Sequence, residues 1–160
     1  MNIILNRYVA TNIVVSIVIL TIVYVLQYIF NLAPCDMCIN ERYPYFLIIT
    51  FGVINFLIKS KNKISELIIK IFFALIYFFG FLYSLYHVGI ERKFWIGSSN
   101  CSSKNTALDI ETLSSQIMQT PVIRCDEPTI LLNLISIAEL NSAAMGILLL
   151  FSLIVLYKRI

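Results

Sequence analysis

The apolar residues VATNIVVSIVILTIVYVLQYIF, from Val9 to Phe30, are followed directly by NLAPCDMCINER, from Asn31 to Arg42. The first segment contains no charged residue. A helix needs about 20 apolar residues to cross the hydrocarbon core of a bilayer. A cleaved secretory signal has a shorter apolar core and a small-residue cleavage site. We therefore expect residues 9–30 to span a membrane, with a Cys-x-x-Cys pair immediately after the span.

The rest of the chain has the composition of a membrane protein. Of its 160 residues, 59% are hydrophobic and only 13% are charged, and the mean hydropathy is +0.87. Soluble domains are about 25% charged. Three further apolar segments, 43–58, 67–88 and 139–157, are long enough or nearly long enough to cross a bilayer. The predicted fold class is an all-α membrane protein, a four-transmembrane-helix bundle in a single domain over residues 1–160.

Charge placement predicts the orientation of this bundle. Cytoplasmic loops carry an excess of basic residues, and one side of the bundle holds Arg7, Lys59, Lys61, Lys63, Lys158 and Arg159 with a single acid, Glu66. We therefore expect both termini to be cytoplasmic. The opposite loops, 31–42 and 89–138, then face the outside, where disulfides persist. Those loops hold all four cysteines, Cys35, Cys38, Cys101 and Cys125.

The outer loops carry two further expectations. An acid is favourable near a helix N-terminus, so we expect the fourth span to begin near Glu139, with residues 130–137 at the membrane interface. Residues 106–118 place apolar side chains at helical spacing, which fits an amphipathic surface helix or an ordinary loop turn. Phe94 and Trp95 are suited to anchor the start of this loop at the interface.

The Cys-x-x-Cys pair is the strongest chemical signal in the sequence. Two sulfurs at this spacing close a small, reducible ring, and the pKa of one thiol is commonly lowered. The second apolar segment begins a few residues later, so its helix N-terminus also favours a thiolate. Arg42 shares a face with Cys38 if the backbone between them is helical. Asp36 has the opposite effect if its carboxylate points at either sulfur.

Other interpretations of the same residues stay open. The cysteines could be inert buried residues or two structural disulfides, and Arg42 could be an interface residue. His87 could bond water at the interface or a quinone carbonyl, and Glu139 could pack between helices or handle a proton. One Cys-x-x-Cys pair with a lone histidine is a poor zinc pattern, so we predict no metal site. A single histidine also excludes bis-histidine haem ligation, and no basic patch for nucleic acid is present.

Taken together, the chain resembles the DsbB family of bacterial inner-membrane disulfide-generating proteins. Residues Pro34 to Arg42 are similar to the family motif P-C-x-x-C-x-x-x-R. Cys101 and Cys125 in the second outer loop, and four spans with both ends inside, also match. The stretches Tyr86 to Glu91 and Cys125 to Glu127 are similar to one subgroup.

The resemblance implies a relay of thiol–disulfide exchange. A reduced periplasmic thioredoxin-fold oxidase, DsbA-like, would attack Cys101 to form a mixed disulfide, which Cys125 would resolve or shuttle. Cys35 and Cys38 would be the pair next to a membrane quinone, ubiquinone or menaquinone, with Cys38 as the thiolate facing the ring. Arg42 would stabilise that site, and His87 is a candidate for binding the quinone. The cysteines would face the periplasm.

Three other functions remain as alternatives. A vitamin K epoxide reductase-like enzyme would also use quinone chemistry, but its Cys-x-x-Cys is expected after the loop cysteines rather than before them. A structural membrane subunit braced by disulfides would keep both bridges in mild reductant. A soft-metal binding protein would retain stoichiometric metal through its thiols.

Overall fold

The structure is a computed structural model, and it describes residues 3–58, 62–95, 125, 130–131 and 135–158. Cys101 and the predicted surface helix at 106–118 lie outside the described residues. The described elements are α1 (Ile3–Tyr28), α2 (Asp36–Asn40), α3 (Tyr43–Ile58), α4 (Lys63–Glu91), β1 (Ile130–Leu131), β2 (Ile135–Ser136) and α6 (Ile137–Tyr157).

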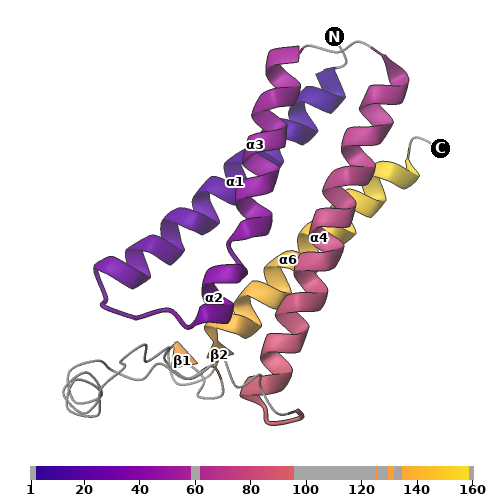
Figure 1. The fold of residues 1–160 in the computed structure, drawn as a ribbon. Coiled ribbons are helices and arrows are strands. Elements are labelled where there is room, and N and C mark those ends of the chain that lie inside the picture. The colour runs from indigo at the N-terminus through magenta and orange to yellow at the C-terminus, as the bar shows by residue number, and fades with distance from the viewer. Residues whose placement is uncertain (1–2, 59–61, 96–124, 126–129, 132–134, 159–160) are drawn as a thin grey trace, which may run out of the picture.

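The long helices pack in two pairs that lie side by side. Helix α1 packs on α3 and α4 packs on α6, while α3 and α4 join the two pairs (Figure 1). The start of α1, the end of α3, the start of α4 and the end of α6 lie at one end of the bundle (Figure 1). Helix α2, the last turns of α4 and the start of α6 lie at the other end. The Cys-x-x-Cys segment is therefore at the end of the bundle away from the start of α1 and the end of α6.

The prediction of a helical membrane protein is confirmed in part. Three described helices are long and apolar enough to cross a membrane: residues 5–28 of α1, all of α4 and all of α6. Helix α3 begins and ends where the sequence predicts, but its 16 residues rise only about 24 Å, less than the roughly 30 Å hydrocarbon core. The fourth span and the orientation of the termini stay predictions.

Apolar side chains cover much of the outer surface of these helices. In α1, the side chains of Val14, Ile17 and Val18 are 48–57% exposed. A water-soluble bundle would turn such a face toward its core. An exposed apolar surface of this extent is typical of a region that lipid or another protein covers. This agrees with a membrane-spanning chain.

Inside the bundle, polar side chains pair with one another. The hydroxyls of Tyr8 and Ser152 lie 2.6 Å apart and link α1 to α6. Tyr77 in α4 donates to Asn12 in α1 over 2.7 Å. Hydrogen-bonding side chains in the interior hold helices together where lipid supplies no hydrophobic driving force between them.

The segment before α6 contains structure that the sequence did not predict. Two-residue strands, β1 and β2, pair antiparallel there, so the described chain is not all-helical. The helix begins at Ile137 and has Glu139 in its first turn, which agrees with the predicted start near this acid. Ser136 accepts a hydrogen bond from the Glu139 amide, and the Glu139 carboxylate accepts one from the Ser136 amide, which forms a capping box. Glu139 also pairs with Arg92, so this acid fixes the helix start.

Candidate functional site

Helix α2 forms at the Cys-x-x-Cys pair because Cys35 caps it. The chain leaves α1 through Asn31, which has a positive φ of 53°, a conformation that asparagine tolerates. Cys35 is extended, with φ −74° and ψ 166°, and its sulfur accepts a hydrogen bond from the Cys38 amide over 3.2 Å. The turn of helix brings the two sulfurs to 2.8 Å from each other. The pair is therefore placed to form and break a disulfide with little movement.

The two cysteines have different surroundings. Cys35 is buried and its thiol donates to the Cys38 sulfur. That hydrogen bond and burial raise the pKa of Cys35 well above the usual thiol range, although His87 and the Cys38 amide act in the other direction. Cys38 is partly exposed, and its sulfur is the acceptor of that hydrogen bond. Asp36, between them, is exposed and lies on the outer side of α2.

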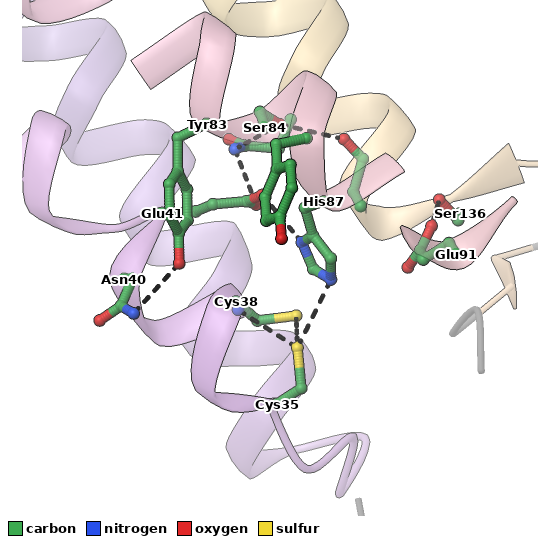
Figure 2. A network of polar contacts seen from close by, with 12 residues as sticks. Cys35, Cys38, Asn40, Glu41, Tyr83, Ser84, His87, Glu91 and Ser136 are labelled. Carbon is green, nitrogen blue, oxygen red and sulfur yellow. Dashed lines mark hydrogen bonds and ion pairs between the residues drawn. The ribbon is translucent and has the colours of Figure 1, made fainter. Parts of the chain in front are cut away.

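His87 and Glu41 form a buried pair against Cys35. His87 comes from the last turns of α4, and its Nε2 lies 3.6 Å from the Cys35 sulfur. Its Nδ1 lies 2.8 Å from a carboxylate oxygen of Glu41, which follows α2. Figure 2 shows the imidazole between the carboxylate and the sulfurs. When Nδ1 donates to the carboxylate, Nε2 is the nitrogen that exchanges a proton with Cys35.

Further polar contacts hold Glu41 in place. The second carboxylate oxygen accepts a hydrogen bond from Asn141 of α6 over 2.9 Å. The Asn141 oxygen in turn accepts one from the Tyr45 hydroxyl over 2.7 Å, and its amide donates to Ser84 over 3.3 Å. These bonds join α3, α4 and α6 around the Cys-x-x-Cys end of the bundle. A buried carboxylate with several donors is fixed in position.

On the other side of the pair, Cys38 and Arg42 line one pocket. The pocket encloses about 60 Å³, is partly open, and is lined mainly by apolar side chains from α1, the segment before α2 and the start of α6. Its polar lining residues are Gln27, Cys38, Glu41, Arg42, Tyr45 and Asn141. Apolar clefts with a few fixed polar groups are typical of small-molecule sites.

Arg42 is held at that pocket by two contacts, and one of its donors is unpaired. Its Nη1 donates to Gln27 over 2.8 Å, and the guanidinium lies 5.1 Å from the centre of the Tyr24 ring. Its buried Nε has no hydrogen-bond partner among the residues that the structure describes. A buried donor without a partner is costly, so an acceptor oxygen that reached this nitrogen would be stabilising.

The predicted site residues fall into separate places. Cys38 and Arg42 line the pocket, whereas His87 contacts Cys35 and is not among the pocket's lining residues. Cys125 is 1% exposed and belongs to the same buried cluster as Cys35, Met37 and Ile90. Cys101 lies outside the described residues.

Glu41 and Asn141 are functional candidates that the sequence alone does not single out. The available signal was an acid directly beside the motif arginine at the edge of an apolar span. Such a residue is costly to bury without a partner.

Comparisons with known proteins cover most of the chain. A model of the family described as "Disulfide bond formation protein DsbB" matches residues 6–155. The protein named "Uncharacterized protein RP370" from Rickettsia prowazekii (strain Madrid E) is 30% identical over 161 residues, which cover 96% of this chain and 91% of that protein. No solved structure matches.

Proposed function

The chain belongs to the DsbB family of disulfide bond formation membrane proteins, and from this we propose that it is a quinone-dependent protein-disulfide oxidoreductase. In this proposal it lies in the bacterial inner membrane with its cysteines facing the periplasm. It reoxidises a DsbA-like thioredoxin-fold protein and delivers the electrons to ubiquinone or menaquinone. The observation that supports the quinone site is the unpartnered Arg42 Nε in a pocket that Cys38 also lines.

The first step is thiol–disulfide exchange with the soluble partner. The partner's thiolate attacks Cys101 of a Cys101–Cys125 disulfide, and Cys125 leaves as a thiolate. The second thiol of the partner then attacks the mixed disulfide and releases Cys101. The partner is now oxidised, and the loop pair has gained two electrons. Each step needs a thiolate and an accessible sulfur.

The second step moves those electrons to the buried pair. Cys125 lies in the same buried cluster as Cys35, so we assign the attack of Cys125 to Cys35 of a Cys35–Cys38 disulfide. Cys38 then leaves as a thiolate on the pocket side. Attack by Cys101 on Cys125 restores the loop disulfide and releases Cys35, which takes a proton. Two electrons have then moved from the Cys101/Cys125 pair to the Cys35/Cys38 pair, and one disulfide has formed for the one that was broken.

The described residues explain why the two sulfurs differ in role. Cys35 returns to its thiol form because its pKa is raised by its hydrogen bond to Cys38 and by burial. His87, oriented by Glu41, is within reach to deliver or remove that proton. Cys38 is left as the hydrogen-bond acceptor and the sulfur that faces the pocket.

Arg42, Gln27 and Cys38 would hold a quinone headgroup in the pocket. Bound there, the quinone would supply an acceptor for two electrons and two protons from the dithiol. Arg42 provides a permanent cation and a free donor at the pocket wall. The apolar lining excludes water from the reduced pair, which limits side reactions of the thiolate.

The experiment that tests this proposal is steady-state quinone reduction by the purified protein with a reduced periplasmic thioredoxin-fold dithiol. Wild type should turn over. Cys38→Ala and Cys101→Ala should abolish turnover, and Arg42→Ala should weaken it. Turnover that persists without Cys38 would contradict the relay. The relay would also be contradicted if the protein reduced none of the quinones supplied and both disulfides resisted mild reductant. That is the behaviour expected of a structural subunit braced by disulfides.

A further inference from the structure

Three possible metal-ligand atoms lie close together at the Cys-x-x-Cys pair. The sulfurs of Cys35 and Cys38 and a ring nitrogen of His87 all lie within 4.8 Å of one another. The sequence does not predict this grouping, because His87 is 52 positions after Cys35. Two thiolates and an imidazole are ligands that zinc prefers.

The spacing of these atoms matches tetrahedral coordination with a small adjustment. Zinc binds sulfur at about 2.3 Å and nitrogen at about 2.0–2.1 Å, so tetrahedral ligands lie about 3.6 Å apart for sulfur and nitrogen, and about 3.8 Å for two sulfurs. The observed distance from Cys35 Sγ to His87 Nε2 is 3.6 Å. The two sulfurs, at 2.8 Å, would separate by about 1 Å, which rotation of the partly exposed Cys38 side chain provides.

The surroundings of His87 also suit a metal ligand. Metal-binding histidines almost always give their second ring nitrogen to a carboxylate or carbonyl, which fixes the ring. Here Nδ1 contacts the buried Glu41 carboxylate, and Nε2 faces the sulfurs. Figure 2 shows the ring held in that orientation. The carboxylate is itself held by Asn141.

We propose that the reduced Cys35–Cys38 pair binds one Zn²⁺ together with His87 Nε2, with a fourth position open to a small ligand. Binding replaces the two thiol protons, which are released, and transfers no electrons. Oxidation of the pair to a disulfide removes both thiolate ligands, so the site exists only in the reduced protein. Binding itself does not depend on the proposed function. Its consequence does: bound zinc would hold the pair reduced and inhibit electron transfer.

The test uses the full chain with Cys101→Ser and Cys125→Ser, purified through a tag without histidine. Only Cys35 and Cys38 then supply thiols, and His87 is the only histidine of the chain. Co²⁺ is the probe, because its visible and thiolate charge-transfer bands report tetrahedral sulfur coordination, and Zn²⁺ is added as the competitor. The reduced protein should bind one Co²⁺ per chain and release it to Zn²⁺.

Further substitutions in the Cys101→Ser/Cys125→Ser protein distinguish loss of a metal ligand from general destabilisation of the fold. Cys38→Ser should abolish binding, and His87→Ala should weaken it at least about tenfold. Glu41→Gln should weaken it about 10- to 100-fold, as loss of a partner of a metal-bound histidine does. Tyr8→Phe removes a buried hydrogen bond in the terminal half of the bundle and should leave binding unchanged. Each variant is compared as a monodisperse, helical sample.

Three results would overturn the proposal: no Co²⁺ binding by the reduced protein, equal Co²⁺ binding by the oxidised and reduced proteins, and full affinity in the His87→Ala variant. In parallel, quinone reduction by the wild-type protein with a reduced dithiol is measured in metal-free buffer. Turnover there without metal binding rejects the zinc site alone, whereas metal binding without turnover rejects the oxidoreductase and keeps the site.

Discussion

His87 Nδ1 lies 2.8 Å from a carboxylate oxygen of Glu41, and both side chains are almost completely buried. The opposite nitrogen of the ring faces Cys35 at 3.6 Å. A carboxylate that holds one ring nitrogen of an imidazole leaves the other nitrogen to exchange a proton with the thiol. The Glu41–His87 contact also links the C-terminal end of α2 to the last turns of α4.

Asn141→Leu should destabilise the protein because it takes one donor from the buried Glu41 carboxylate. Loss of a hydrogen bond to a buried charge costs about 2–3 kcal/mol. Denaturant or thermal unfolding of the reduced protein in detergent measures this. The matched control is Asn40→Leu, which removes an amide bonded to Tyr83 at an exposed position and should cost about 0.5 kcal/mol or less. Equal losses of unfolding free energy in the two variants would show that the hydrogen bond from Asn141 to Glu41 contributes no more than an exposed one.

Arg42→Lys should raise the KM for quinone about tenfold while the protein stays folded. Lysine keeps the charge but has neither the planar fork nor the Nε donor, and a hydrogen bond from a charged donor is worth about 1.5–3 kcal/mol. Quinone titrations at saturating dithiol give this value. Arg92→Lys is the control, because Arg92 is exposed and pairs with Glu139, and such pairs contribute little. An unchanged KM for Arg42→Lys would remove Arg42 from the quinone site.

The alkylation rate of Cys35 in the reduced protein should rise only at a pH above the usual thiol range of about 8.5. The pKa of Cys35 is raised by its hydrogen bond to Cys38 and by burial. At a given pH below this raised pKa, a smaller fraction of Cys35 is therefore thiolate than in a free cysteine. Peptide mass spectrometry across a pH series measures the midpoint. In Cys38→Ala the hydrogen bond is absent, and the midpoint should fall. A midpoint for Cys35 at or below about 8.5 in the wild type would contradict this assignment.

Much of the fold follows from the sequence because apolar length and helix caps are local properties. Helix α3 has the predicted bounds, and the others differ at their ends by a few residues. Arg42 was predicted beside Cys38, and both line one pocket, because four residues of nearly helical chain fix their relation. The start of α6 was predicted to within two residues because an acid in the first turn of a helix is also a local signal. The capping box that Ser136 forms with Glu139 was not predicted.

The contacts between distant helices did not follow from the sequence. Glu41 and His87 are 46 positions apart, and Glu41 and Asn141 are 100 apart. Their meeting depends on how α3, α4 and α6 pack, and hydrophobic periodicity does not encode that packing. His87 was therefore weighed as a quinone ligand or a water-bonded residue, and its contact with Cys35 was not foreseen.

Gly89→Ala should displace the indole of Trp95. A methyl group at Gly89 would come within 2.0 Å of that ring, which stacks on Tyr86 and donates to its carbonyl over 2.9 Å. Overpacking of this kind costs about 1–3 kcal/mol. Trp95 is the only tryptophan, so its fluorescence emission should shift to longer wavelength. Gly146→Ala, where the nearest atom is at 3.1 Å on Phe81, should leave the emission unchanged; an identical spectrum in Gly89→Ala would contradict the packing.

The most direct test of the account is single-turnover quinone reduction by the prereduced Cys101→Ser/Cys125→Ser protein, which retains only the Cys35–Cys38 pair. Rapid mixing with quinone, without any dithiol, isolates electron transfer from this pair. One quinone should be reduced per chain, with formation of the Cys35–Cys38 disulfide, and no quinone should be reduced when Cys38→Ala is added. A prereduced pair that stays reduced in excess quinone would contradict the central claim that Cys38 delivers its electrons to the pocket beside Arg42.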